Sequence, residues 1–231
     1  MEEILKKWYP LLKGEITKPY FGELVSRVAG VPASDLCPPA HQVFRVYRDL
    51  GPDDVKVVIL GLDPYIRGEA CGYSFSSEKG NVPPSLRIIF NTIRKETGQQ
   101  RTDSNLADWV QQGVFLLNTV LTTERGKTLA HGKWGWQNFT GETLRHLASS
   151  SSPVVFMIWG NMAKESLVQY ITPALKGPKL VLENCHPMAE IYGRYKFSES
   201  GHFTKANEFL VAHGKTPILW ASSSAPTTTS T

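Results

Sequence analysis

Four short apolar runs constrain the fold of this chain more than any other feature of its sequence. They cover residues 55–61, 113–118, 153–160 and 179–183. Runs of this length and composition are typical of strands that are buried on both faces of a parallel sheet. The first run is the strongest strand signal in the chain, and it ends at Gly61, directly before a polar segment.

Segments whose apolar residues have helical spacing separate these runs. We expect a loop over residues 31–39 and helices over residues 2–18, 21–29, 41–49, 85–97, 106–112, 136–148, 161–170 and 203–213. Right-handed crossovers place such helices on both faces of a sheet. The sequence therefore predicts an α/β fold, with a single domain over residues 1–221 and a central four-stranded, mostly parallel sheet. The Ser/Thr-rich tail, residues 222–231, is expected to be disordered.

Composition narrows the classes of protein to which the chain can belong. The 231 residues carry a formal net charge of +4, which permits nucleic-acid binding but does not require it. Cys37, Cys71 and Cys185 have no CxxC spacing and cannot all pair, which indicates reduced thiols. The six histidines are scattered without the spacing of a metal site, so we expect no metal.

The ends and the apolar runs of the chain favour an intracellular protein of the cytoplasm or the nucleus. No apolar run reaches the ~18 residues that a membrane span requires. The start, Met-Glu-Glu-Ile, lacks the basic-then-apolar order of a signal peptide. We therefore expect no membrane attachment.

Polar residues follow all four predicted strands. They are Asp63 after the first, Asn118 at the end of the second, Asn161 after the third and His186 after the fourth. Each alone is typical of a turn or a helix cap. The carboxyl ends of parallel strands meet at one edge of a sheet, where ligands bind. An acid, two amides and an imidazole at that edge together indicate a functional site.

Several spaced motifs resemble those of the family-1 uracil-DNA glycosylases. They are Gly61-Leu62-Asp63-Pro64-Tyr65 with residues 68–76, then Pro83-Pro84-Ser85-Leu86, residues 113–122, His131-Gly132-Lys133-Trp134 and His186-Pro187. Residues 18–21 and 38–44 also fit, and the resemblance covers about residues 8–220. Motifs in one shared order are far more specific than any single match.

The resemblance implies a base-excision repair enzyme that flips uracil out of DNA and hydrolyses its N-glycosidic bond, leaving an abasic site and free uracil. Cleavage leaves a cationic sugar and an anionic base, so the site needs an oriented water and donors for the uracil O2. Asp63 is the general-base candidate for that water. His186 is the candidate donor to O2, through one N–H of a neutral imidazole. No cofactor is needed.

Four residues are expected to bind the base itself. The Asn118 amide both donates and accepts at the O4/N3 edge, where cytosine presents the reversed pattern. Phe75 stacks on the base, although the sequence alone favours an ordinary core aromatic at this position. Tyr65 packs beside C5, where a thymine methyl would clash. Leu62 contributes its backbone N–H near O2, together with that of Asp63.

Rim residues are expected to contact DNA. They are Ser85, Asn161, Ile191, Tyr192 and Arg194. Ser85 follows two prolines at the start of a predicted helix, where it is a candidate both for N-cap and for phosphate binding. The resemblance implies uracil-containing DNA as the partner and a monomeric state, with a protein inhibitor of the glycosylase as a further candidate partner.

Some positions depart from the family pattern. Leu62 replaces the usual glutamine, and Ile66 replaces the usual histidine. The family has His-Pro-Ser-Pro-Leu, whose leucine wedges into the duplex, whereas this chain has His-Pro-Met-Ala-Glu. An ungapped comparison puts Glu190 at the wedge, where a carboxylate is unfavourable beside phosphates. Ile191 or Tyr192 is then the candidate wedge, unless the loop only packs on the domain.

Two other hypotheses compete with a glycosylase. A non-enzymatic DNA-binding or replication-accessory protein on the same scaffold would explain the altered loop and Ile66. The retained Asp63, Asn118 and His186 argue against it, because a scaffold has no use for reacting groups. A generic nucleotide-binding enzyme ranks last, because the strands are not followed by GxGxxG or GxxxxGK[ST].

Overall fold

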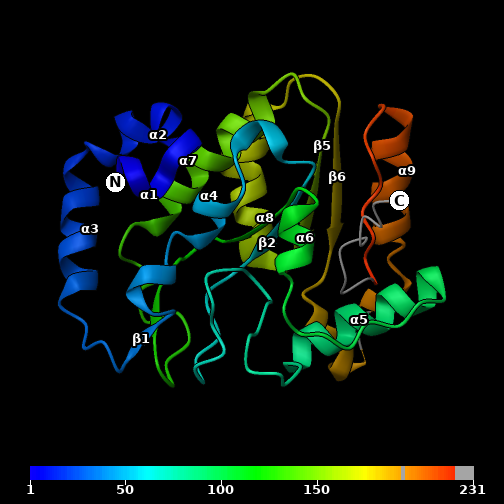
Figure 1. The fold of residues 1–231 in the computed structure, drawn as a ribbon, viewed down its shortest axis with the longest axis horizontal. Helices are drawn as coiled ribbons and strands as arrows, with labels where there is room; N and C mark the ends of the chain where they lie inside the picture. Colours follow the sequence, from blue (N-terminus) through cyan, green and yellow to red (C-terminus); the bar gives the residue numbers. More distant parts are fainter. Residues whose placement is uncertain (194–195, 222–231) are drawn as a thin grey trace, which may run out of the picture.

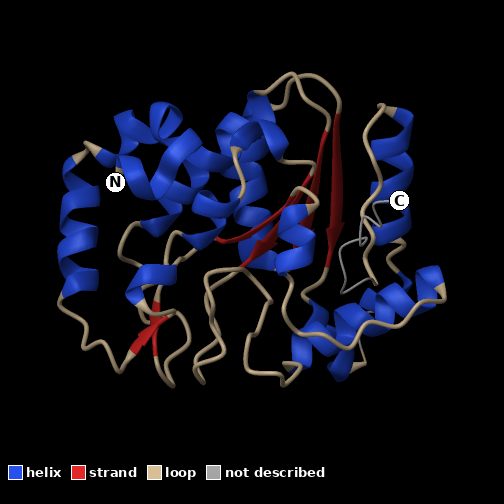
Figure 2. Ribbon diagram, in the orientation of Figure 1, coloured by secondary structure: helices blue, strands red, loops and turns tan. Residues whose placement is uncertain are grey.

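A parallel four-stranded sheet forms the centre of the computed structural model, which describes residues 1–193 and 196–221. The strand order is β3 (Val114–Asn118), β2 (Val57–Gly61), β5 (Val154–Trp159) and β6 (Lys179–Asn184). All three neighbouring pairs are parallel. The predicted α/β fold is confirmed (Figure 2).

Burial explains why the central strands lack alternation. Every residue of β2 and of β5 is buried, whereas β6, at the edge, buries only Leu182. Helices cover both faces of the sheet: α7 and the N-terminal helices lie on one side and α9 on the other (Figure 1). A strand that is covered on both faces gains from apolar side chains at every position, which accounts for the continuous runs in the sequence.

The helices follow the predicted order along the chain. They are α1 (Glu2–Leu5), α2 (Tyr9–Ile16), α3 (Pro19–Ala29), α4 (Arg45–Asp49), α5 (Pro84–Thr97), α6 (Ala107–Gln111), α7 (Trp136–Ser149), α8 (Asn161–Ser166) and α9 (His202–Ala212). A π-helical turn, Leu167–Ile171, extends α8. Short 3-10 helices occur at Lys6–Trp8, Ala40–Gln42, Pro52–Asp54, Thr172–Ala174, Pro187–Tyr192 (η6) and Phe197–Glu199 (η7).

Three local predictions were wrong in detail. The helix expected over residues 2–18 is broken by a 3-10 turn, and the one expected over residues 41–49 begins only at Arg45. The loop expected over residues 31–39 contains a strand, β1 (Leu36–Cys37), which pairs antiparallel with β4 (Thr123–Glu124). A two-residue strand is too short to show a period, so only the tertiary pairing reveals it. The tail, residues 222–231, and Arg194 lie outside the described residues.

A cluster of buried aromatic rings fastens the N-terminal helices to the sheet. The ring of Trp8 lies 5.0 Å from that of Phe115 on β3 and 5.6 Å from that of Tyr47. Its indole N–H donates to the backbone carbonyl of Leu50 at 2.7 Å. Because a buried indole needs an acceptor, this bond fixes the position of Trp8 and, with it, of the first helices.

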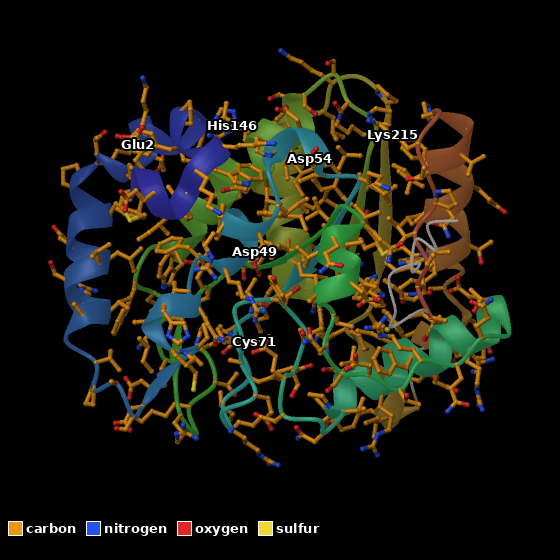
Figure 3. The ribbon with its side chains drawn as sticks, in the orientation of Figure 1. Glu2, Asp49, Asp54, Cys71, His146 and Lys215 are labelled. Atoms are coloured by element: carbon orange, nitrogen blue, oxygen red, sulfur yellow. The ribbon has the colours of Figure 1, made fainter. Side chains whose placement is uncertain are left out.

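Different loops lie at the amino ends and at the carboxyl ends of the strands. Asp54 precedes β2, and Cys71 belongs to the long loop that follows it; Figure 3 shows Asp54 near the upper part of the sheet and Cys71 below the strands. The loops after β2 and β3 lie at the carboxyl ends of these parallel strands, where the sequence predicts the candidate site residues. No helix among the described residues is both long and apolar enough to cross a membrane.

Two helical glycines give a matched test of packing. A Cβ on Gly141 of α7 would lie 2.5 Å from the ring of the buried Tyr170, whereas one on Gly22 of α3 would meet nothing within 4 Å. We expect Gly141→Ala to lower the free energy of unfolding by about 1–3 kcal/mol through overpacking. Gly22→Ala is expected to raise it by ~0.5–1 kcal/mol. Chemical denaturation measures both, and shifts of the same sign would contradict the packing of α7.

Candidate active site

A pocket of about 410 Å³ opens at the carboxyl ends of β2 and β3. The predicted catalytic and base-binding residues all line it, together with Ser85: Leu62, Asp63, Tyr65, Phe75, Asn118 and His186. Its other walls are mostly apolar, among them Val43, Val46, Leu116 and Leu121. A concave, mostly apolar pocket with a few polar groups is typical of a small-molecule or base-binding site.

The register of β2 against β3 places Asn118 directly beside Gly61. A Cβ on Gly61 would collide with Oδ1 of Asn118 and would lie 2.9 Å from Cβ of Ser74. Only glycine therefore leaves room for the amide at the floor of the pocket. The sequence shows this glycine as the end of a strand, but its role in seating Asn118 follows only from the strand pairing.

Asp63 is held by a backbone group from a distant loop. Its Oδ2 accepts a hydrogen bond of 2.7 Å from the backbone N–H of Leu129, a residue in the left-handed conformation with φ 56°. Burial raises the pKa of Asp63 above its ordinary value, and the Leu129 N–H partly offsets this effect. The sequence carries no signal for Leu129, because its contribution is made by the backbone.

His186 is neutral, and its tautomer is set by the helix that follows it. Burial lowers the pKa of His186 below its ordinary value, so the ring is uncharged near neutral pH. Nδ1 accepts a hydrogen bond of 3.2 Å from the backbone N–H of Met188. The proton must then be on Nε2, which is left as a donor on the wall of the pocket.

Phe75 and Tyr65 form the aromatic walls. The Phe75 ring lies 6.2 Å from that of His186 and 5.7 Å from that of Trp159, and its backbone is left-handed with φ 62°. The hydroxyl of Tyr65 donates to the backbone carbonyl of Phe75 at 3.1 Å and lies 2.8 Å from Oγ of Ser85. These bonds fix both rings with respect to each other.

The expected N-cap role of Ser85 was wrong. Helix α5 begins at Pro84 and its N-cap is Pro83, so Ser85 lies inside the first turn. It is only 5% exposed, and its hydroxyl is bonded to that of Tyr65. The helix starts one residue earlier than expected, at Pro84, because proline is well suited to the first turn of a helix. The side chain of Ser85 thus supports an aromatic wall of the pocket.

The backbone beyond β2 presents unused donors. The carbonyl of Leu62 accepts from the backbone N–H of Val120 at 3.0 Å and from Oγ1 of Thr119 at 2.8 Å. In the described part of the chain, no hydrogen bond uses the N–H groups of Leu62 or Asp63. These two donors are therefore free for a ligand at the turn.

The remaining rim residues lie outside the pocket. Asn161 is exposed at the start of α8, and a Cβ on the preceding Gly160 would lie 3.1 Å from Cβ of His186. Ile191 and Tyr192 are 62% and 77% exposed at the end of η6. Glu190, which directly precedes them in the chain, bonds to Ser198 on the adjacent turn. Among the residues that the structure describes, no group of His, Cys, Asp or Glu is arranged to hold a metal.

Comparisons with known proteins agree on one family. A model of the uracil DNA glycosylase superfamily matches residues 48–211. The uracil-DNA glycosylase of Idiomarina loihiensis is 37% identical over 92% of this chain and 99% of that protein. That of Amoebophilus asiaticus is 40% identical over 94% of this chain and 98% of that protein.

Solved structures extend this similarity to the fold. The crystal structure of mimivirus uracil-DNA glycosylase superposes with a TM-score of 0.82 at 27% identity, over 93% of this chain and 86% of that one. A variant of the mimivirus protein in complex with UGI superposes with a TM-score of 0.83 at 26% identity, over 93% and 88% of the two chains.

The state of His186 is open to direct measurement. We expect nitrogen NMR to show a neutral ring at pH ~7 with its proton on Nε2, because burial lowers the pKa and Nδ1 accepts from the backbone. The exposed His213, whose Nδ1 lies 2.8 Å from a backbone carbonyl, is the internal comparison and should carry its proton on Nδ1 when neutral. A charged His186 ring, or a proton on its Nδ1, would contradict the geometry.

Proposed function

This chain belongs to the uracil DNA glycosylase superfamily, and we propose that it excises uracil from DNA in the pocket at the carboxyl ends of its strands. It is a monofunctional glycosylase of base-excision repair, whose products are free uracil and an abasic site. The observation that carries the assignment to this pocket is the convergence there of a buried carboxylate, a neutral imidazole and an amide.

Asp63 is the proposed general base. A water beside its carboxylate is oriented toward the sugar carbon as the glycosidic bond breaks. The bond from Leu129 occupies Oδ2, which leaves Oδ1 to accept from the water. The negative charge of Asp63 also favours the positive charge that develops on the sugar. Ile66 lines the same pocket and offers no polar group, so Asp63 is the charged partner of the water on this wall.

His186 and the turn after β2 are proposed to stabilise the leaving base. Negative charge develops on the uracil O2 as the bond breaks. A neutral imidazole with its proton on Nε2 can donate a hydrogen bond to that oxygen and stabilise the charge. The free N–H groups of Leu62 and Asp63 are two further donors at the same edge of the sheet. Donors held rigidly before the reaction lower its barrier, because they need no reorganisation at the moment of cleavage.

Selection of uracil is assigned to three side chains. Asn118 lies against Gly61, which leaves space for its amide to donate and accept at the O4/N3 edge. Phe75 covers one face of the base. Tyr65, locked by its bonds to Ser85 and to the carbonyl of Phe75, closes the space beside C5 and excludes the methyl group of thymine.

DNA is proposed to lie across the rim of the pocket. Asn161 at the start of α8 is exposed beside His186, and Ile191 and Tyr192 project from η6, where an apolar side chain can wedge between bases. Ser85, being buried, supports the rim rather than presenting a hydroxyl to it. Arg194 remains a candidate phosphate contact. We further propose a monomer, and an inhibitor of the kind seen bound to the mimivirus protein as a ligand of the same rim.

A uracil-containing oligonucleotide tests the assignment. We expect the protein to release uracil and leave an alkali-labile abasic site in both single-stranded and duplex substrates, with no release from matched cytosine or thymine oligonucleotides. Absence of any abasic product with micromolar protein would overturn the proposed activity. It would instead favour a non-enzymatic DNA-binding protein on the same scaffold.

Substitution of the two reacting residues is expected to lower turnover strongly. Asp63→Asn should reduce kcat by about 10²–10⁴-fold through loss of the general base. His186→Leu should reduce it by about 10²–10³-fold through loss of the donor to O2. Asp54→Asn and His213→Leu are matched controls, since both residues are exposed and lie outside the pocket. Wild-type rates in folded Asp63 and His186 variants would contradict the assigned roles.

The rate is expected to fall on the acid side of neutrality. Burial raises the pKa of Asp63, so its carboxylate is protonated, and lost as a base, at a higher pH than an exposed aspartate would be. Single-turnover rates from about pH 4 to about pH 8 should decline tenfold per pH unit below this pKa. The residual rate of Asp63→Asn should lack this decline. An acid limb that persists in that variant would assign it to another group.

A further inference from the structure

Glu190 is held by an arrangement that the chemistry of the pocket does not use. Its Oε2 accepts from the backbone N–H of Ser198 at 2.7 Å, and its Oε1 accepts from Oγ of the same serine at 2.6 Å. Nζ of Lys95 on α5 donates to that Oγ at 2.6 Å. Ser198 is 4% exposed, so one buried residue joins the carboxylate of η6 to the ammonium of α5.

This arrangement fixes the far end of a helix whose near end carries His186. At the near end, the N–H of Met188 donates to Nδ1 of His186, and the N–H of Ala189 donates to its carbonyl at 2.8 Å. At the far end, the N–H of Gly193 donates to the carbonyl of Glu190 at 3.0 Å. Runs of 3-10 helix longer than three or four residues are uncommon. The six residues of η6 therefore require tethers. Among the residues that the structure describes, Glu190 provides the side-chain hydrogen bonds that join η6 to η7.

The tether leaves two large side chains projecting from the helix. Ile191 and Tyr192 follow Glu190 directly and are 62% and 77% exposed. The Glu190 carboxylate accepts two hydrogen bonds from Ser198, whose hydroxyl in turn accepts from the Lys95 ammonium, so Glu190 does not face the solvent as a free negative charge. An acidic residue next to the rim thus costs less against DNA phosphates than its sequence position suggests.

We infer that Glu190 is a positioning residue, which clamps η6 to Ser198 so that Ile191 and Tyr192 are held ready to enter duplex DNA as uracil leaves it. The inference rests on the proposed function and names the substrate on which the clamp acts. A wedge is needed only where a base must be expelled from a stack. A single strand offers its base already unstacked, at little energetic cost. The clamp therefore matters for duplex substrate and not for single strands.

The test compares kcat/KM on the same uracil oligonucleotide as a single strand and as a duplex. Glu190→Ala removes both bonds to the carboxylate and is expected to lower the duplex value at least about tenfold, since a single hydrogen bond to a charged group already contributes about that much. The single-strand value should stay within about twofold of wild type. Glu190→Gln keeps the shape of the side chain and part of its hydrogen bonding, so its kcat/KM on the duplex should lie between those of wild type and Glu190→Ala. Ser198→Ala removes the Oγ bond but keeps the bond from the backbone N–H, so it should show a smaller loss that is again selective for the duplex. It should add no further loss in the Glu190→Ala background, where both bonds are already absent.

Glu199→Gln is the matched control. Glu199 lies in η7 beside Ser198, is 59% exposed, and forms an ion pair with the exposed Lys196. Removing a negative charge near DNA by itself favours binding. A charge effect would therefore raise duplex activity in Glu190→Gln and Glu199→Gln alike, whereas the clamp requires a fall in the first and no fall in the second. Thermal unfolding of each variant separates loss of fold from loss of positioning.

A fluorescent base gives a second measurement. With 2-aminopurine next to uracil in a duplex, Asp63→Asn protein should raise the fluorescence as the stack opens, and adding Glu190→Ala should reduce that rise. Equal losses on single strands and duplexes, or unchanged duplex activity with an unchanged fluorescence rise, would overturn the clamp. A wild-type protein that releases uracil from neither substrate would overturn the proposed function instead, and the clamp with it.

Discussion

The pairing of β2 with β3 is the constraint on which the rest of the site depends. Because the two strands are parallel and in register, Gly61 lies beside Asn118, and the absence of a side chain on Gly61 gives the amide its place. The same pairing aligns the turn after β2, whose carbonyl at Leu62 is bonded by Thr119 and Val120. A slip of one residue would exchange the two faces of the strand and remove the floor of the pocket.

Burial in this pocket shifts the pKa values of the two candidate reacting residues, Asp63 and His186, in opposite directions. Loss of solvent disfavours the charged form of each group, so the pKa of Asp63 rises and that of His186 falls. The imidazole is thereby kept neutral, and the N–H of Leu129 helps to keep the carboxylate ionised. One apolar environment thus serves a base and a donor, with a backbone hydrogen bond correcting the unwanted part of the effect on Asp63.

The loop after His186 shows how a departure from the family pattern is accommodated. Glu190, which an ungapped comparison puts where the family has its leucine, accepts hydrogen bonds from the backbone N–H and the hydroxyl of Ser198. The large exposed apolar side chains of this loop are instead Ile191 and Tyr192. Leu62 and Ile66 are similar cases: one acts through its backbone, and the other lines the pocket without a polar group. The overall arrangement is retained while individual side chains differ.

The sequence by itself determined the α/β fold, the four strands and the meeting of Asp63, Asn118 and His186, and the family resemblance added Leu62, Tyr65 and Phe75 to the predicted pocket. Continuous apolar runs have few structural solutions, and the carboxyl ends of parallel strands share one edge, so Asp63, Asn118 and His186 had to converge. Only the tertiary structure decided the β1–β4 pair, the buried position of Ser85, the tautomer of His186, and the contacts of Asp63 with Leu129 and of Glu190 with Ser198. These depend on backbone groups and on residues far apart in the chain, whose approach leaves no period or motif in the sequence.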